Sequence, residues 1–212
     1  LLEKVEIQKI AAEGKSIAYI DEKVLFVPNT LPGDIVDVQV TRKRKNFMEG
    51  IVTHTHRFSA LRIAPACTHF GICGGCKWQN LPYEKQLEFK QQEIVDNLQR
   101  IGKVELQNVS PIIGSPKTTY YRNKLEYTFC NKRFLTREEI ANGQDIDRTP
   151  AVGFHVPGLF DKVIDIKKCY LQAEPSNAVR NFIRDYAIEH ELSFYDIRKQ
   201  AGFLRTLIVR TS

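Results

Sequence analysis

Three cysteines crowd into one short stretch of the chain, Cys67, Cys73 and Cys76, with the spacing Cys-x5-Cys-x2-Cys. The segment between them is rich in glycine and holds few residues that could form a core. Thiolates this close together on a loop are typical of a shared metal centre. Three ligands are one short of a tetrahedral thiolate site. The sequence therefore predicts a remote fourth ligand, which is either Cys130 or Cys169.

The two remaining cysteines differ in their predicted surroundings. Cys130 falls within a strand predicted over 125–130, whereas Cys169 follows a short strand at 163–166 and precedes a helix that opens at Pro175. A side chain at the end of an element is easier to aim at a neighbouring loop. We therefore predict a metal site of Cys67, Cys73, Cys76 and Cys169, with Cys130 as a free thiol. The spacing favours a [4Fe–4S] cluster over zinc and leaves zinc as the alternative.

Short strands precede the cysteine loop. Apolar runs at 5–10, 17–20, 23–27, 35–40 and 47–53, separated by turns, predict a small closed barrel of the OB type. A basic run lies between the last two strands and is followed by an aromatic residue: Arg42, Lys43, Arg44, Lys45 and Phe47. On such a barrel these residues predict contact with RNA phosphates, and a solvated turn is the alternative.

Helices and further strands follow the loop. Pro82 and Gly102 bound a predicted helix over 82–102 whose apolar face packs on a core. A second helix is predicted after Pro175, with an apolar face formed by Val179, Phe182, Ile183, Tyr186 and Ala187. Residues 136–150 are predicted to form a polar loop. Alternation over 125–130 predicts a half-buried strand. Donors at its start, Arg122, Asn123 and Lys124, lie beside two tyrosines and predict an RNA contact, or an ordinary strand end.

Composition narrows the class of partner. The chain has 212 residues, a net charge of +6 and a pI of about 9.0, which favours a polyanion. No apolar run approaches a membrane span, and the odd cysteine count does not fit a secreted disulfide framework. We expect a protein of the reducing cytoplasm with no membrane partner. The chain begins at Leu1 and ends after an apolar run, so we expect it to belong to a longer protein.

Several stretches together resemble the RNA uracil-5-methyltransferase family (the RumA/TrmA group). FVPNTLPGDIVDVQV is similar to its TRAM barrel, CTHFGICGGCKWQNLPYEKQLEFK to its cluster loop, and YYRNKLEYTF to its central domain. A stretch similar to GFHVPGLFDKVIDIKKCYLQ carries the fourth cluster cysteine of the family, which supports Cys169. A TRAM barrel together with a cluster loop resembles the ribosomal-RNA branch.

The resemblance implies a fold class that is mainly β with α. It places an OB-like TRAM barrel at 1–60 and an α+β iron–sulfur domain at 61–212, with the cluster loop at 61–81 and the helix at 82–102. It implies an enzyme that transfers a methyl group from S-adenosylmethionine to C5 of uridine in 23S ribosomal RNA, acting as a monomer. The expected Rossmann-like methyltransferase domain is absent from this chain, and so are the catalytic and S-adenosylmethionine-binding residues. A non-catalytic RNA-binding module with a structural zinc or iron–sulfur site of four cysteines is the alternative.

Overall fold

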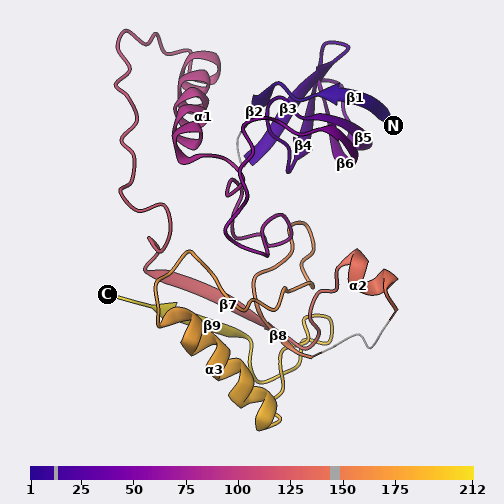
Figure 1. Cartoon of the computed structure of the whole chain (residues 1–212), viewed down its shortest axis with the longest axis vertical. Helices are drawn as coiled ribbons and strands as arrows, with labels where there is room; N and C mark the ends of the chain where they lie inside the picture. The colour runs from indigo at the N-terminus through magenta and orange to yellow at the C-terminus, as the bar shows by residue number, and fades with distance from the viewer. Residues whose placement is uncertain (12–13, 144–148) are drawn as a thin grey trace. The chain divides into compact units, whose positions relative to one another are not determined.

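A computed structural model describes residues 1–11, 14–143 and 149–212, and Figure 1 shows its elements. The chain forms two compact units. The first comprises residues 1–65 and 77–115, and the second comprises residues 66–76 and 116–212. The cysteine loop therefore belongs to the second unit, although residues on both sides of it belong to the first.

The first unit is built around a mixed six-stranded sheet of order β1-β5-β6-β4-β3-β2. Its strands are β1 (Leu2–Glu6), β2 (Lys9–Ile10), β3 (Lys15–Ile20), β4 (Lys23–Pro28), β5 (Ile35–Lys43) and β6 (Phe47–Arg57). β4 and β6 run parallel, and every other pair is antiparallel. Alternate residues turn inward to one core. Its buried members are Val5, Ile7, Ala18, Leu25, Val27, Val36, Val38 and Met48.

The turn before β5 is held by a buried carboxylate. Asp34 accepts hydrogen bonds from the backbone N–H groups of Leu31 (2.7 Å) and Ser59 (2.7 Å). Its two oxygens also accept from Arg62, at 3.1 Å and 2.6 Å. The preceding Gly33 has φ of 91°, a left-handed conformation that glycine adopts without a steric penalty. Asp34 thus ties the turn to the segment that leaves β6.

The first long helix differs from its prediction. α1 (Tyr83–Asp96) continues into a π-helical turn, η2 (Asn97–Ile101), and neither element contains a buried residue. Ile101, predicted to pack on a core, is 79% exposed. Gly102 is right-handed, and Lys103 takes the left-handed conformation expected of the glycine. The periodicity predicted the helix correctly and its burial incorrectly.

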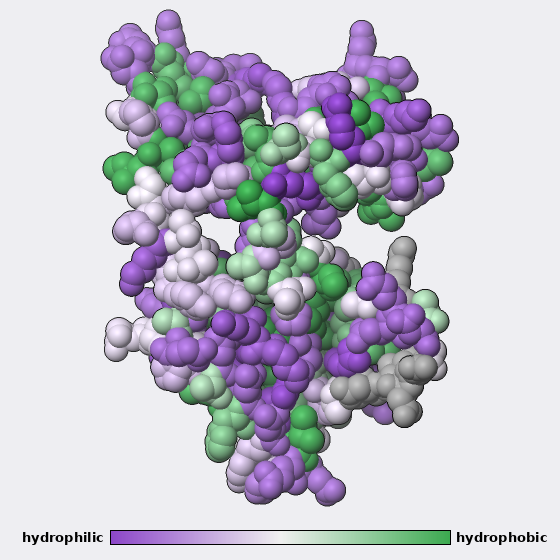
Figure 2. Space-filling view, viewed as in Figure 1, coloured by the Kyte–Doolittle hydropathy of each residue, from purple (hydrophilic) through white to green (hydrophobic). Residues whose placement is uncertain are grey.

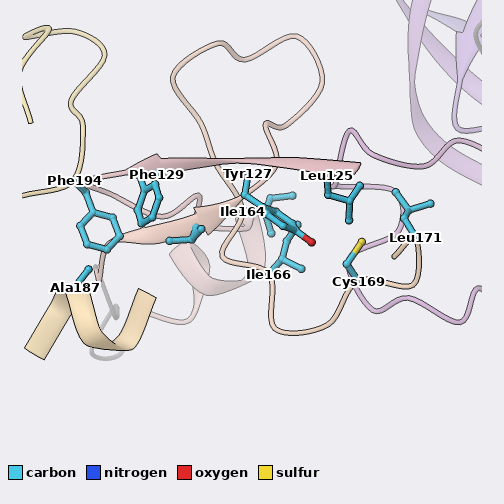
Figure 3. Close-up of a cluster of buried hydrophobic side chains, with 10 residues drawn as sticks. Leu125, Tyr127, Phe129, Ile164, Ile166, Cys169, Leu171, Ala187 and Phe194 are labelled. Carbon is cyan, nitrogen blue, oxygen red and sulfur yellow. The ribbon is translucent and has the colours of Figure 1, made fainter. Parts of the chain in front are cut away.

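The second unit is organised around a three-stranded antiparallel sheet of order β8-β7-β9. β7 (Lys124–Cys130) is central, between β8 (Ala151–Gly153) and β9 (Thr206–Arg210). Figure 3 shows side chains from β7, from residues 164–171 and from the second long helix meeting in one core. Cys169 lies at one end of that core beside Leu171.

Within its described residues, the second unit has two helices. α2 (Arg137–Ala141) lies within the predicted loop, and Thr136 and Glu139 form a capping box at its start. Residues 144–148 of that loop lie outside the described residues. α3 (Ser176–Glu189) begins after Pro175 as predicted. Its predicted core face is wrong in part, because Phe182 is 69% exposed while Arg180 is buried.

Hydrophilic and hydrophobic residues are interspersed on the face of the molecule shown in Figure 2. Among the helices that the structure describes, none combines the length and the apolar character needed to cross a bilayer.

Candidate cysteine centre and nucleic-acid surface

The cysteine loop is a series of tight turns. The N–H of Phe70 donates to the carbonyl of Cys67 (3.1 Å), and the N–H of Cys73 donates to the carbonyl of His69 (2.8 Å). The N–H of Gly74 donates to the carbonyl of His155 (3.1 Å), which anchors the loop to the second unit. A Cβ at position 74 would lie 2.8 Å from that carbonyl oxygen. Glycine is therefore required there by a close backbone approach.

The fold brings the three loop cysteines and Cys169 together. The pKa of Cys73 is raised to about 11, chiefly by burial, with smaller contributions from the nearby Cys76, Cys67 and Cys169 and against a hydrogen bond from the N–H of Gly75. Burial likewise raises the pKa of Cys169, with contributions from Cys76 and Cys67. All four thiols are free of disulfides. Three cysteines of the loop and a fourth far along the sequence thus lie near one another.

A buried asparagine fixes the backbone at Cys169. The Oδ1 of Asn177 accepts from the N–H of Cys169 (2.7 Å), and its Nδ2 donates to the carbonyl of the same residue (3.2 Å). Asn177 lies in the first turn of α3, and its Nδ2 also donates to Glu174 (2.8 Å). The start of α3 therefore sets the position of the fourth cysteine.

Four cysteine sulfurs are suitable ligands for a metal centre, but their side chains are not arranged around a single metal ion. Within residues 1–11, 14–143 and 149–212, no group of three or more His, Cys, Asp and Glu side chains has the geometry to hold a metal ion. Thiols whose pKa is raised by burial and by one another need a cation to become thiolates together. A four-iron cluster is larger than a single ion, so its ligands lie farther apart than the ~3.8 Å between sulfurs around tetrahedral zinc.

Cys130 is placed elsewhere. It is buried with Ala151 and Val163, and its Sγ donates to the carbonyl of Lys132 (3.2 Å). It also lines a separate pocket of about 180 Å³ in the second unit. The sequence predicts Cys130 within the strand, and the structure places it at the strand's end with its side chain buried.

The predicted basic run of the first unit is exposed. Arg42 and Lys43 lie at the end of β5, and Arg44 and Lys45 lie in the hairpin that follows. Arg42 pairs with Glu49 (3.4 Å) across the hairpin. The half-buried ring of Phe47 packs edge-on against Phe26, with 6.0 Å between ring centroids. The run therefore presents cations to solvent, while Phe47 serves partly as packing.

The second predicted group lies at one end of the sheet of the second unit. Arg122, Asn123 and Lys124 are all exposed at the start of β7. Lys124 stands opposite Arg210 in the β7–β9 register, which places two cations face to face. Opposed like charges destabilise a strand pair unless an anion joins them. Arg210 has no local signal in the sequence, because only the strand register brings it beside Lys124.

Comparison with known proteins gives one match within the first unit and others along most of the chain. Residues 3–53 match the TRAM domain family. The chain is 54% identical, over 96% of its length, to an uncharacterized RNA methyltransferase of Bacteroides thetaiotaomicron. It is 49% identical, over 98% of its length, to one of Porphyromonas gingivalis. It covers 45% and 46% of these two proteins, so it spans about half the length of the curated relatives it matches.

A solved structure is also similar. It is the crystal structure of Pyrococcus abyssi tRNA (uracil-54, C5)-methyltransferase in complex with S-adenosyl-L-homocysteine. The TM-score is 0.63 at 25% sequence identity, and the match covers 99% of this chain and 42% of that chain.

These matches correct two predictions. The sequence predicts an N-terminal portion of the ribosomal-RNA branch. The similarity to RNA methyltransferases, however, runs along 96% of the chain. The solved neighbour is a tRNA enzyme. The predicted fold class set the chain apart from the methyltransferase fold, yet 99% of the chain aligns with a methyltransferase structure. Mixed sheet with helices describes the chain better than mainly β with an absent methyltransferase domain.

Proposed function

We propose that the protein is an S-adenosylmethionine-dependent RNA methyltransferase that methylates uracil at C5. The similarity to RNA methyltransferases along 96% of the chain carries the proposal. The TRAM match and the net charge of +6 support an RNA substrate. The solved neighbour, a uracil C5 methyltransferase in complex with S-adenosyl-L-homocysteine, supports both the position modified and the methyl donor.

The described residues contribute RNA binding to this activity. Exposed cations occur on each unit, at 42–45 and at Arg122 and Lys124. Methylation of C5 requires a base that is unstacked from its neighbours, and cations can bind the phosphates beside such a base. Cys130 is not proposed as the nucleophile, because it is buried and its Sγ donates to a backbone carbonyl.

The activity is tested by incubating the purified protein with isotope-labelled S-adenosylmethionine and unmodified RNA. The RNAs are transfer-RNA and ribosomal-RNA transcripts, tested separately. Mass spectrometry of the digested nucleosides should detect labelled 5-methyluridine from one of them. RNA binding without methyl transfer to either transcript would instead favour the non-catalytic RNA-binding module.

We further propose that Cys67, Cys73, Cys76 and Cys169 hold a [4Fe–4S] cluster. The convergence of these four thiols, with Cys130 kept apart, supports this ligand set. When bound, the cluster would supply a structural link, because methyl transfer from a sulfonium needs no electrons. The four cysteines would then join the loop to the segment that leads into α3.

Iron and sulfide analysis after anaerobic purification tests the cluster. Cys169→Ala should lose most of the bound iron, and Cys130→Ala should retain it. Stoichiometric zinc without sulfide would identify a zinc site instead. Full iron content in Cys169→Ala together with loss in Cys130→Ala would overturn the ligand set.

A further inference from the structure

Two tyrosines from distant segments lie side by side next to the cysteine centre. The ring centroids of Tyr120 and Tyr170 are 5.9 Å apart, with 38° between the ring planes. The N–H of Tyr120 donates to the carbonyl of Tyr170 (2.7 Å), and the N–H of Arg122 donates to the carbonyl of Leu171 (2.8 Å). Backbone hydrogen bonds therefore hold the two rings together, and Tyr170 directly follows the candidate ligand Cys169.

The backbone at Tyr120 is held in an uncommon conformation. Its φ of 55° lies in the left-handed region, which large side chains rarely adopt. The ring is nevertheless 37% exposed, so burial of the side chain does not account for this conformation. Residues in such conformations persist where the surrounding structure fixes them, and they concentrate at binding sites. The hydrogen bond to the carbonyl of Tyr170 is one of the contacts that fix Tyr120 in this conformation.

Exposed cations lie in the segments that carry the tyrosine pair and in the adjoining strands. The Nζ of Lys168 lies 5.1 Å from the ring centroid of Tyr170. Arg122, Lys124 and Arg210 are exposed at the adjoining end of the β7–β9 sheet. In the part of the chain that the structure describes, no carboxylate pairs with any of these four cations. By contrast, Lys162 and Lys167 of the same unit lie beside Asp161 (3.9 Å) and Asp165 (3.2 Å).

A second aromatic row of the same unit provides a comparison. Phe182, Tyr186 and His190 stack along α3, with centroid distances of 6.1 Å and 3.8 Å. Two acidic residues, Asp185 and Glu189, directly precede Tyr186 and His190 in the sequence. Acidic neighbours repel a polyanion, whereas the cations around Tyr120 attract one. Of the two aromatic groups, only the Tyr120–Tyr170 pair combines stacking faces with positive charge.

We propose that Tyr120 and Tyr170 form a stacking platform for an unpaired RNA base, with Arg122, Lys124, Lys168 and Arg210 binding the adjacent phosphates. Aromatic side chains within a basic surface are the common means of holding single-stranded nucleic acid. The platform deepens the proposed function, since it rests on RNA as the substrate. By this proposal, the segment around Cys169 also binds the RNA strand.

The test compares Tyr120→Leu and Tyr170→Leu with the matched control Tyr186→Leu. The probes are a single-stranded oligouridine containing one 2-aminopurine, whose fluorescence reports stacking, and an abasic oligonucleotide of equal charge. Each platform variant should bind the base-containing strand about 5- to 150-fold more weakly than the unaltered protein. Its affinity for the abasic strand and its salt dependence should be unchanged. Tyr120→Phe should retain both the affinity and the fluorescence change.

Other outcomes separate the platform from the enzyme. Equal loss in Tyr186→Leu, or equal loss for abasic and base-containing strands, would overturn the platform. So would tighter binding of an acidic peptide than of the oligonucleotide. Methyl transfer is measured on the same preparations. If the unaltered protein methylates RNA and both platform variants bind the strand normally, the proposed function stands and the platform is rejected. Base-dependent binding without methylation would support the platform and reject the enzyme.

Discussion

The guanidinium of Arg180 lies over the ring of Tyr127, with 5.1 Å between its central carbon and the ring centroid. Arg180 is 1% exposed, and Tyr127 is fully buried. Its Nη2 donates to the carbonyl of Lys167 (2.6 Å), and its Nη1 donates to Asn177 (3.0 Å). This buried cation opposes the effect of burial on Cys169, whose pKa it lowers. It therefore joins the sheet core, the start of α3 and the cysteine centre.

Replacing Arg180 should weaken the second unit. Arg180→Met removes a buried cation from the neighbourhood of the Cys169 thiol and leaves the carbonyl of Lys167 without this donor, at an expected cost of about 1–3 kcal/mol. Urea unfolding followed by circular dichroism should show the loss. The only tryptophan, Trp78, lies in the first unit, so its fluorescence transition should not move.

Arg180→Lys is the companion variant. It retains the charge but loses the planar fork of donors. It should therefore keep more bound iron than Arg180→Met while still losing stability. Equal iron content in both variants would show that the charge of Arg180 does not serve the centre.

Gly74→Ala should disrupt the cysteine loop. Its new Cβ would meet the carbonyl oxygen of His155 at 2.8 Å, and the loop would have to move away from the sheet. We expect a loss of about 1–3 kcal/mol in the stability of the second unit, from overpacking. Gly75→Ala is the matched control, because its Cβ would make only ordinary contacts, the nearest 3.5 Å from the Sγ of Cys73. If the two variants retain the same iron content, the close approach at Gly74 is not what positions the loop.

Arg122→Ala and Lys124→Ala should each weaken RNA binding and flatten its salt dependence. Each lost phosphate contact on a single strand reduces the slope of log K against log salt by about 0.7. Titration of an oligouridine at several salt concentrations measures that slope. Lys162→Ala removes the same charge from a lysine beside Asp161 and should leave the slope unaltered. An unchanged slope in both test variants would remove this end of the sheet from the RNA surface.

Asp34→Asn should destabilise the first unit. The substitution preserves shape but removes the charge that binds Arg62 and two backbone N–H groups. Charge-assisted hydrogen bonds of this kind contribute about 1.5–3 kcal/mol. The Trp78 transition in urea should move to lower concentration. Asp21→Asn, at an exposed turn with φ of 46°, removes the same charge and should not move it.

Local context carries part of the sequence prediction. Cys169 follows a strand and precedes Pro175, which favours it over Cys130 as a fourth ligand. That ligand set stays a prediction, and the structure adds that Cys76 and Cys67 raise the pKa of Cys169. The strands of the first unit followed from short apolar runs and turn residues, although the first predicted strand is divided into β1 and β2. The capping box of Thr136 and Glu139 was also present in the sequence, but the polar character of its surroundings obscured it.

What depends on distant partners could not be predicted from the sequence. Helical periodicity predicted apolar faces on α1 and α3, yet periodicity does not say whether another element covers a face, and Ile101 and Phe182 are exposed. The pairing of Tyr120 with Tyr170 arises from backbone hydrogen bonds between residues far apart in the chain. The opposition of Lys124 and Arg210 arises from strand register. Neither leaves a local sequence signal.

The order in which the chain is synthesised matters for the cysteines. The chain runs from the first unit to the cysteine loop, returns to the first unit, and then enters the second unit. The loop thiols leave the ribosome about 90 residues before Cys169, which corresponds to roughly 5–20 s of translation. During that interval the nascent protein carries three of the four thiols that lie near one another in the finished fold. Oxidants and stray metal ions can reach them before the fourth arrives. Assembly of the proposed cluster would therefore wait until the segment that carries Cys169 has been synthesised.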